Sequence, residues 1–319
     1  MARKKSERHC AVSDSAPEAA RQLAFVRLDQ PLPDLAGQLG ASFEEYGFAV
    51  VEGHGIDQRL IDRADALMRQ FFALPDAVKR AYHRTGQAGA RGYTPFGVEQ
   101  AKGARVQDLK EFWHVGRDLP PGHPYAAHMR PNIWPDELPD FRPVMQDLYL
   151  AFDWTGRRIL SAIALYLGED EVFFEDSVRD GNSVLRLLHY PPIEAAPEGA
   201  IRAAAHEDIN TITLLLGAEA AGLELLARDG TWLPVSPPPG ALAVNVGDML
   251  QRLTAGRLRS TTHRVVNPAG DAARTSRYSM PFFLHFRPDF LIRPMFEGGE
   301  DPITAQDYLM ERLREIRLA

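Results

Sequence analysis

From Val184 to Phe286 the sequence contains seven short runs rich in β-branched and aromatic residues, separated by turn signals such as Asp229-Gly230. The runs are VLRLLHY, TITLLLG, GLELLAR, TWLPV, ALAVNV, RLRSTTHRVV and RYSMPFFLHF. Short apolar runs between turn signals at this spacing are typical of the strands of a β-sandwich or barrel. We therefore expect a jelly roll in residues 181–319.

Helical patterns precede and follow this β region. Apolar residues recur at helical spacing from Leu35 to Gly47, after Asp57, and from Pro143 to Gly168, and again in ITAQDYLMERLREIRL near the end. FAVVEGHG, between the first two patterns, indicates a short buried strand. The sequence thus predicts a mixed α/β protein with an all-β core, backed by N-terminal and central helices.

Three regions are expected within one integrated domain. Residues 1–20 have no periodicity and predict a mobile arm. Residues 21–180 form a helical and strand region, in which the Gly- and Pro-rich segment 84–106 is expected to be a lid loop. Residues 181–319 form the β core with its C-terminal helix.

Composition excludes several classes of partner. Hydrophobic residues make up 45% of the chain and charged residues 25%, the balance of a soluble globular protein. No window offers the roughly 18 apolar residues of a membrane span. With 36 basic and 43 acidic side chains the net charge is −7, which does not favour nucleic acid or an anionic membrane. We expect a small molecule as the partner; the sequence leaves the oligomeric state open.

Cysteine usage points to a reducing compartment. The only cysteine is Cys10, which excludes a disulfide framework and a cysteine-based zinc cluster. The start MARKKSERH lacks the apolar stretch of a signal peptide, so we expect a cytoplasmic protein. Any metal must then be held by histidine and carboxylate.

Such a ligand set is present in the β region. His206 and Asp208, two positions apart on an extended segment, share one face, while Glu207 points the other way. His263 lies 55 residues beyond Asp208 in another strand-like run. Two imidazoles and one carboxylate form the facial triad of non-haem Fe(II), although the same donors also suit catalytic zinc. A half-buried histidine bonded to a strand neighbour is the competing interpretation of the His206 pair.

An arginine and a serine in a later strand can form a fork for a carboxylate. Arg277 and Ser279 share a face, and an arginine on the inward side of an apolar strand is costly unless an anion balances its charge. The competing interpretation is an ion pair with a distant acidic residue. Arg274, three residues earlier, is expected on the opposite face.

These residues carry a family resemblance. The chain resembles the isopenicillin N synthase-like family of iron(II) oxygenases, many of which use 2-oxoglutarate. The matching motifs are YGFAVVEGHGI, FFALP, ARGYTPFG, PNIWPDELPDF, LLHYPP, HEDINTITLLL, VNVGDMLQRLT, HRVVNP, RYSMPFF and DYL. They occur in the family's order over about nine-tenths of the chain.

The resemblance implies a distorted double-stranded β-helix, which is a jelly roll, with iron at its mouth. It makes His206, Asp208 and His263 the ligands of Fe(II). It also implies a dioxygenase that uses 2-oxoglutarate and O2 to hydroxylate, desaturate or ring-close a small organic molecule, with release of succinate and CO2. No catalytic residue beyond the metal centre is expected.

The resemblance also assigns the cosubstrate site. Arg277 and Ser279 match the family's R-x-S, which grips the far carboxylate of 2-oxoglutarate, and Tyr190 matches a tyrosine on the same carboxylate. Phe283 is expected to line the cosubstrate wall. One departure is Leu188, where plant members usually have an asparagine.

For the substrate, the segments that form the pocket rim in relatives contain Arg91, Tyr93, Trp113 and His114. Arg91 would suit an anionic group. Three alternatives stay open: an oxidase of the isopenicillin N synthase type that uses no 2-oxoglutarate, a zinc-dependent hydrolase, and a non-catalytic jelly-roll binding protein. The chain ends at Ala319 without the C-terminal tail that reaches the active site of isopenicillin N synthase, which weakens a tripeptide-cyclase interpretation.

Overall fold

The computed structural model describes residues 23–86, 89–98, 109–192, 202–216, 222–267 and 273–315. Its helices are α1 (Leu32–Glu45), α2 (Gln58–Phe72), α3 (Asp76–Ala81), α4 (Phe141–Leu167), α5 (Glu175–Val178), α6 (Asp248–Leu253) and α7 (Ala305–Glu315). Its strands are β1 (Phe25–Arg27), β2 (Phe48–Glu52), β3 (Gly92–Thr94), β4 (Glu111–Gly116), β5 (Val184–Tyr190), β6 (Ala203–His206), β7 (Ile212–Leu216), β8 (Leu223–Leu226), β9 (Trp232–Pro234), β10 (Leu242–Val246), β11 (His263–Val265), β12 (Arg277–Leu284), β13 (Leu291–Ile292) and β14 (Ile303–Thr304).

Local sequence signals fix the ends of the main helices. Asp57 caps α2, because its carboxylate accepts a hydrogen bond from the Arg59 backbone N–H at 2.9 Å. The 27-residue helix α4 ends at Gly168, whose φ of +86° lies in the left-handed region that glycine adopts without strain. The predicted helices before the β core are therefore confirmed.

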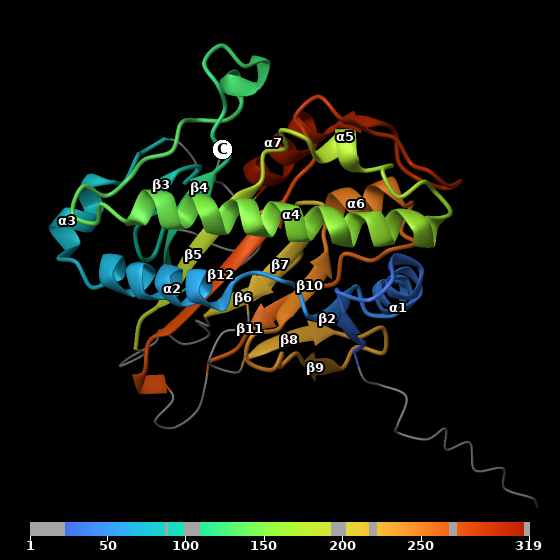
Figure 1. Ribbon diagram of the computed structural model, residues 1–319, viewed down its shortest axis with the longest axis horizontal. Coiled ribbons are helices and arrows are strands. Elements are labelled where there is room, and N and C mark those ends of the chain that lie inside the picture. Colours follow the sequence, from blue (N-terminus) through green and yellow to red (C-terminus); the bar gives the residue numbers. More distant parts are fainter. Residues whose placement is uncertain are drawn as a thin grey trace, which may run out of the picture.

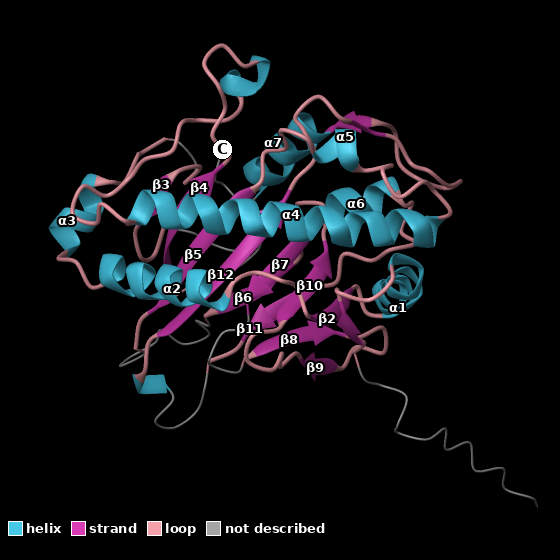
Figure 2. Ribbon diagram, viewed as in Figure 1, coloured by secondary structure: helices cyan, strands magenta, loops and turns pink. Residues whose placement is uncertain are grey.

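Two sheets form the β core. The large sheet has the order β1-β2-β10-β7-β12-β5-β4-β3, and the small sheet the order β6-β11-β8-β9. From β5 to β12 the chain passes repeatedly from one sheet to the other, as in a double-stranded β-helix. The predicted jelly roll with helices on one side is confirmed (Figure 1 and Figure 2).

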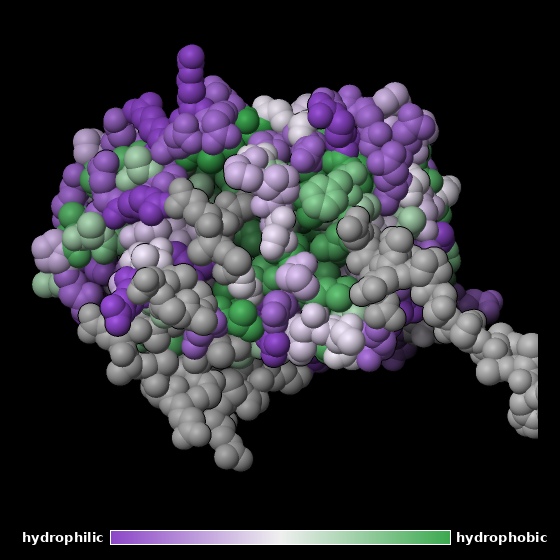
Figure 3. Space-filling view, turned by 90° about the horizontal axis from the view of Figure 1, so that it is seen from below, coloured by the Kyte–Doolittle hydropathy of each residue, from purple (hydrophilic) through white to green (hydrophobic). Residues whose placement is uncertain are grey.

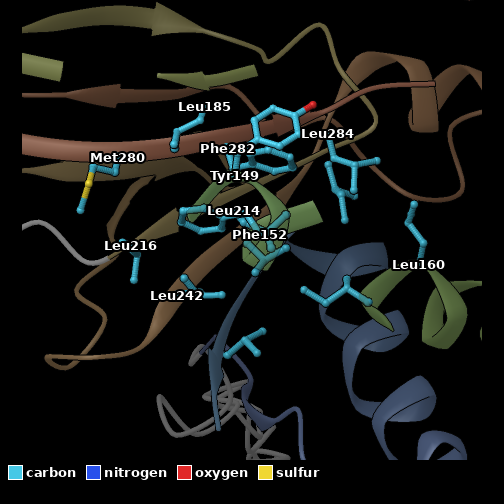
Figure 4. Close-up of a cluster of buried hydrophobic side chains, with 14 of the residues drawn as sticks. Tyr149, Phe152, Leu160, Leu185, Leu214, Leu216, Leu242, Met280, Phe282 and Leu284 are labelled. Atoms are coloured by element: carbon cyan, nitrogen blue, oxygen red, sulfur yellow. The ribbon is translucent and has the colours of Figure 1, made fainter. Parts of the chain in front are cut away.

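The large sheet is covered on both faces. Helix α4 lies across one face (Figure 1), where Phe152 stacks on Phe282 of β12 with ring centroids 5.4 Å apart. Figure 4 shows this helix-side core, to which β12 also contributes Met280 and Leu284. The other face packs against the small sheet. Because side chains alternate along a strand, the odd-numbered residues of β12 face the small sheet, and we call this the inner face.

Helix α1 packs closely against α4 at a glycine. A Cβ added at Gly40 would lie 2.0 Å from the Tyr166 ring, so Gly40→Ala should lower the free energy of unfolding by about 1–3 kcal/mol or more. Gly37, on the same helix, has no atom within 4 Å of the corresponding position. Gly37→Ala should therefore raise stability by about 0.5–1 kcal/mol through helix propensity. Denaturant melts test both variants, and equal destabilisation by the two would contradict this packing.

Some expectations need correction. The predicted lid loop 84–106 contains strand β3, which pairs with β4, while its residues 87–88 and 99–108 lie outside the described residues. Strand β11 covers only three residues of the predicted run RLRSTTHRVV. Strand β6 was expected only as an extended segment at His206, and α6 was not expected. The predicted arm 1–20, with Cys10, also lies outside the described residues.

Within the described ranges no helix is both long and apolar enough to cross a membrane. Seen from below, polar residues predominate along the upper edge of the described surface, and apolar residues gather toward its middle (Figure 3).

Candidate metal centre and cosubstrate site

The end of β6 and the start of β11 hold two histidines side by side. His206 lies opposite His263 in the small sheet, with ring centroids 4.4 Å apart. Asp208 follows β6, and its carboxylate oxygens lie 3.9 Å from Nε2 of each histidine. One possible ligand atom from each residue lies within 4.8 Å of the other two. The fold thus brings together the three residues predicted as ligands.

Both imidazoles are oriented by the backbone. Nδ1 of His206 lies 2.7 Å from the Ala204 carbonyl oxygen, and Nδ1 of His263 lies 3.0 Å from that of Thr261. A ring nitrogen in this position carries the proton and donates it, which leaves Nε2 with a free lone pair. Burial lowers the pKa of His206 to about 4, so the ring is neutral at pH 7. The two Nε2 atoms that face Asp208 are therefore ready to bind a metal.

The carboxylate of Asp208 is held by two neutral side chains. Its Oδ2 accepts hydrogen bonds from Thr213 Oγ1 at 2.5 Å and Asn245 Nδ2 at 2.8 Å. Burial raises the pKa of this carboxyl, but His263, His206 and the two hydrogen bonds together bring it below its ordinary value. Thr213 and Asn245 were not predicted as functional residues, although each is a polar residue inside an apolar strand.

The donor set fits a divalent transition metal. Two neutral imidazoles and one ionised carboxylate suit Fe(II) in the facial triad and also suit zinc. Among the described residues, His206, Asp208 and His263 are the one group of at least three possible ligands with this spacing. Glu207 points away, as predicted, and its Oε1 accepts a hydrogen bond from Thr262 Oγ1. Glu207 is therefore not placed to act as the general base of a zinc hydrolase.

A basic fork lies on the inner face of the large sheet. Arg277 and Ser279 of β12 are 3% and 5% exposed, and Tyr190 of β5 lies opposite Arg277 in the register. The Cζ atom of Arg277 is 5.0 Å from the centroid of the Tyr190 ring. Arg274 is exposed. The structure thus brings together the three residues expected to bind a carboxylate and leaves Arg274 outside.

Phe283 occupies the inner face next to the metal ligands. It lies opposite Thr213, the residue that binds the Asp208 carboxylate. The guanidinium of Arg186 lies over its ring, with Cζ 5.3 Å from the centroid, and over the Phe112 ring at 4.3 Å. Phe283 thus shares the inner face with Arg186 and Thr213, and its role in lining the cosubstrate wall stays a prediction.

His114 also lies on the inner face, where it meets Arg186. Nε2 of His114 accepts a hydrogen bond from Nε of Arg186 at 2.6 Å, and Nδ1 lies 2.6 Å from the Gly89 carbonyl oxygen. Arg186 was not among the predicted site residues. The signal was present, since Arg186 stands four residues before Tyr190 in the apolar strand β5 and therefore shares its face.

Two predicted pocket residues lie elsewhere. Tyr93 and Trp113 are opposite each other in β3 and β4 and face the helices. Trp113 is fully buried against Phe71, with ring centroids 4.7 Å apart. The Tyr93 hydroxyl donates to the carboxylate of Glu111, which also pairs with Lys79 at 2.8 Å. This corrects the prediction that Tyr93 and Trp113 line the pocket: strand alternation puts them in the helix-side core.

Arg91 is buried, and the charge of Asp118 acts on it without a hydrogen bond between the two side chains among the described residues. It is 3% exposed, and its Nη1 donates to the Ala90 carbonyl oxygen at 2.6 Å. Within the described part of the chain, its Nε and Nη2 make no hydrogen bond. A Cβ at Gly116 would lie 1.9 Å from Arg91 Cζ, and Gly116 shares the inner face with His114. The missing side chain at Gly116 therefore makes room for the guanidinium on the inner face.

The buried imidazole of His285 lies within the electrostatic influence of both Arg91 and the predicted metal ligand Asp208. This buried histidine follows β12 on the inner face, and its Nδ1 lies 3.1 Å from the Phe283 carbonyl oxygen. Burial lowers the pKa of His285 to about 4, and the charges of Asp208 and Arg91 act on it in opposite directions. The contact of Arg91 with Gly116 and the bond of Asp208 to Thr213 place both residues on the inner face of the large sheet.

A jelly roll with two histidines, a carboxylate and a buried arginine fork has the arrangement of a mononuclear non-haem iron oxygenase. Comparison with known families agrees. Residues 22–137 match the N-terminal region of the non-haem dioxygenases described from morphine synthesis, and residues 181–286 match the 2OG-Fe(II) oxygenase superfamily.

Individual relatives agree as well. A 2-oxoglutarate-Fe(II) type oxidoreductase of Aspergillus fumigatus is 35% identical over 284 residues, which cover 84% of this chain and 83% of that protein. The crystal structure of a protein assigned to the 2OG-Fe(II) oxygenase family in Caulobacter crescentus is 52% identical, with a TM-score of 0.85, over 92% of this chain and 99% of that one. A full-length protein of Neurospora crassa, crystallised in complex with alpha-KG and thymine, is 26% identical, with a TM-score of 0.82, over 94% of this chain and 98% of that one.

The chain belongs to the 2OG-Fe(II) oxygenase superfamily. It is accordingly an oxidoreductase, a dioxygenase that uses Fe(II), 2-oxoglutarate and O2 to oxidise a small molecule.

Proposed function

We propose that this chain holds Fe(II) on His206, Asp208 and His263 and oxidises a small molecule that carries an anionic group. The observation that carries the metal assignment is the convergence of three ligand atoms within 4.8 Å, two of them imidazole nitrogens with free lone pairs. When bound, Fe(II) and 2-oxoglutarate supply the activation of dioxygen, with 2-oxoglutarate leaving as succinate and CO2.

The cosubstrate assignment rests on the buried fork. We propose that Arg277 pairs with the far carboxylate of 2-oxoglutarate, while Ser279 and Tyr190 donate hydrogen bonds to it. A planar guanidinium can bind a carboxylate at two points, which fixes the direction of the cosubstrate as well as its charge. Phe283 closes the wall beside it and excludes water.

The residues around the metal centre orient its ligands. The Ala204 and Thr261 carbonyl oxygens fix the proton of each imidazole on Nδ1. Thr213 and Asn245 hold one oxygen of Asp208, so the other oxygen is available to the metal. Partners of this kind keep ligands in place without touching the metal.

The burial of Arg91 supports the proposal that the substrate carries an anionic group. A guanidinium that is 3% exposed is costly to bury without a counter-charge, and two of its nitrogens have no hydrogen-bond partner in the described part of the chain. A substrate carboxylate, phosphate or phenolate would supply both the charge and the acceptors. His114 and Arg186 lie on the same inner face and complete the polar side of the proposed pocket.

We further propose a small molecule rather than a nucleic acid or a membrane as the partner, because the net charge is −7. The low cysteine content supports a cytoplasmic location.

A screen for succinate release tests this function. The Fe(II)-loaded protein would be supplied with O2, 2-oxoglutarate and matched panels of anionic and neutral small molecules. We expect succinate to form faster with some anionic compounds than with their neutral analogues. Oxidation of a substrate without consumption of 2-oxoglutarate would support the oxidase alternative. Hydrolysis with zinc and no oxygen uptake would support the hydrolase.

Removing the Arg91 charge should weaken the use of an anionic substrate without lowering the stability of the protein. Arg91→Met should lower kcat/KM for the anionic substrate about tenfold or more, because a desolvated charge pair is worth about 2–5 kcal/mol. In the absence of substrate, Tm should not fall, because the variant removes a buried charge that has no acidic hydrogen-bond partner among the described residues. Arg84→Met is the control, since Arg84 is exposed and donates to the backbone carbonyl oxygens of Ala81 and His83. A large loss of Tm with unchanged kcat/KM would make Arg91 a structural residue.

A further inference from the structure

We propose that Arg202 is a second arginine for the far carboxylate of 2-oxoglutarate, acting together with Arg277. The inference rests on the proposed function, because it extends the fork on β12 to the opposite sheet. Arg202 stands immediately before β6, four residues ahead of His206, and no motif of the sequence analysis includes it.

Arg202 is buried and held firmly in place. It is 1% exposed, and its backbone N–H donates to Asn267 Oδ1 at 2.9 Å. Its Nη2 donates to the carbonyl oxygen of Thr275 at 3.1 Å, two residues before Arg277. The side chain therefore reaches from the edge of the small sheet to the segment that begins β12.

The rest of the guanidinium is left without an acceptor. Across the described ranges, Nε and Nη1 of Arg202 make no hydrogen bond. Burial lowers the pKa of Arg202, and Arg277 lowers it further, while the Tyr190 hydroxyl has the opposite effect. No carboxylate is among the groups that act on it. The charge is thus desolvated, repelled by a second arginine and balanced by no acidic side chain of the described structure.

Both arginines meet at Tyr190. The Cζ atoms of Arg277 and Arg202 lie 5.0 Å and 6.0 Å from the centroid of the Tyr190 ring. Arg202 carries a buried charge that no acidic side chain of the described residues balances, so an anion shared with the neighbouring Arg277 would stabilise it. The carboxylate that the proposed function brings to Arg277 and Tyr190 is an anion of the required charge and size.

A structural role is the competing explanation. The bond from Nη2 to Thr275 could serve only to join the two sheets at this end of the jelly roll. The two roles differ in ligand dependence: a structural role affects every 2-oxo acid alike, whereas an anion-binding role affects only acids with a second carboxylate.

Calorimetric binding of two 2-oxo acids under nitrogen distinguishes these roles. 2-Oxoglutarate and 2-oxopentanoate have the same metal-chelating head, but only the first has a far carboxylate. Both would be titrated into Fe(II)-loaded wild type, Arg202→Gln and Arg202→Lys. Glutamine keeps a donor for the Thr275 oxygen and removes the charge, while lysine keeps the charge. Arg158→Gln is the matched control, because Arg158 is part-buried and donates to the carbonyl oxygens of Leu28 and Gln30.

We expect Arg202→Gln to weaken the binding of 2-oxoglutarate about tenfold or more and to leave the binding of 2-oxopentanoate nearly unchanged. Arg202→Lys should recover part of the loss, and Arg158→Gln should change neither constant. If Arg202→Gln weakened the binding of both acids equally, or did not weaken the binding of 2-oxoglutarate, the inference would be overturned. If the wild type itself bound the two acids equally well, the proposed fork on Arg277 would fail first, and this inference with it.

Discussion

Replacing any one of His206, Asp208 and His263 by alanine is expected to abolish iron-dependent oxidation. Loss of a residue that merely supports a ligand typically costs about 10–100-fold in metal affinity or activity, so loss of a ligand should cost at least the upper end of that range. Each variant should still fold, because the three side chains form a small polar cluster at the edge of the sandwich, outside its apolar cores. Iron affinity, succinate release and Tm measured on the same samples check all three statements.

Glu207→Gln is the matched control for this series. Glu207 stands between two ligands in the sequence but bonds to Thr262 on the other side of the strand. Its substitution should leave iron affinity unchanged. Full activity in His263→Ala would contradict the proposed triad, and loss of iron in Glu207→Gln would show that the ligand set has been assigned wrongly.

The second large effect is expected at the fork. Arg277→Ala should raise the apparent KM for 2-oxoglutarate about 30-fold or more. Removing one partner of a desolvated charge pair costs about 2–5 kcal/mol, and each 1.4 kcal/mol corresponds to a tenfold change in the constant. Arg277→Lys should also bind 2-oxoglutarate more weakly, because it keeps the charge but loses the planar two-point geometry. Titration of 2-oxoglutarate against succinate formation gives these constants.

Arg274→Ala serves as the control for charge near this site. Arg274 lies three residues earlier and is exposed, so its removal should barely change the 2-oxoglutarate constant. Fe(II) binding should survive both substitutions, since neither residue is among the proposed ligands. A larger effect from Arg274→Ala than from Arg277→Ala would contradict the assigned fork.

The β core and its site could be predicted because, in a strand with polar residues among apolar ones, the spacing of the polar residues shows which side chains share a face. In β12 the alternation of Arg277 and Ser279 with apolar neighbours defines which side chains point inward. The same reasoning placed His206 and Asp208 together and Glu207 apart. Helix ends were predictable where a side chain or glycine specifies them, as Asp57 and Gly168 do.

The faces of β4 could not be predicted from its sequence. All six of its residues are buried, so EFWHVG has no alternation of exposed and buried positions to show which side faces the pocket. Trp113 and His114 were assigned together because both lie in a segment that forms the pocket rim in relatives, whereas adjacent residues of a strand must face opposite sides. Only the pairing of β4 with β5, distant in sequence, determines that His114 points inward.

Buried polar groups that depend on distant partners were also missed. Glu111 binds Lys79 at 2.8 Å and His189 at 2.7 Å, and these three residues come from separate parts of the sequence. Arg202 belongs to the same class, because its burial depends on the approach of Thr275 and Tyr190. No local pattern reports contacts of this kind.

The most direct test of the proposed site is a crystal structure of the protein with Fe(II) and 2-oxoglutarate, prepared without oxygen. We predict that iron is bound by His206, Asp208 and His263, and that the far carboxylate of 2-oxoglutarate lies on Arg277, Ser279 and Tyr190. Iron bound by other residues, or 2-oxoglutarate directed away from Arg277, would contradict the account.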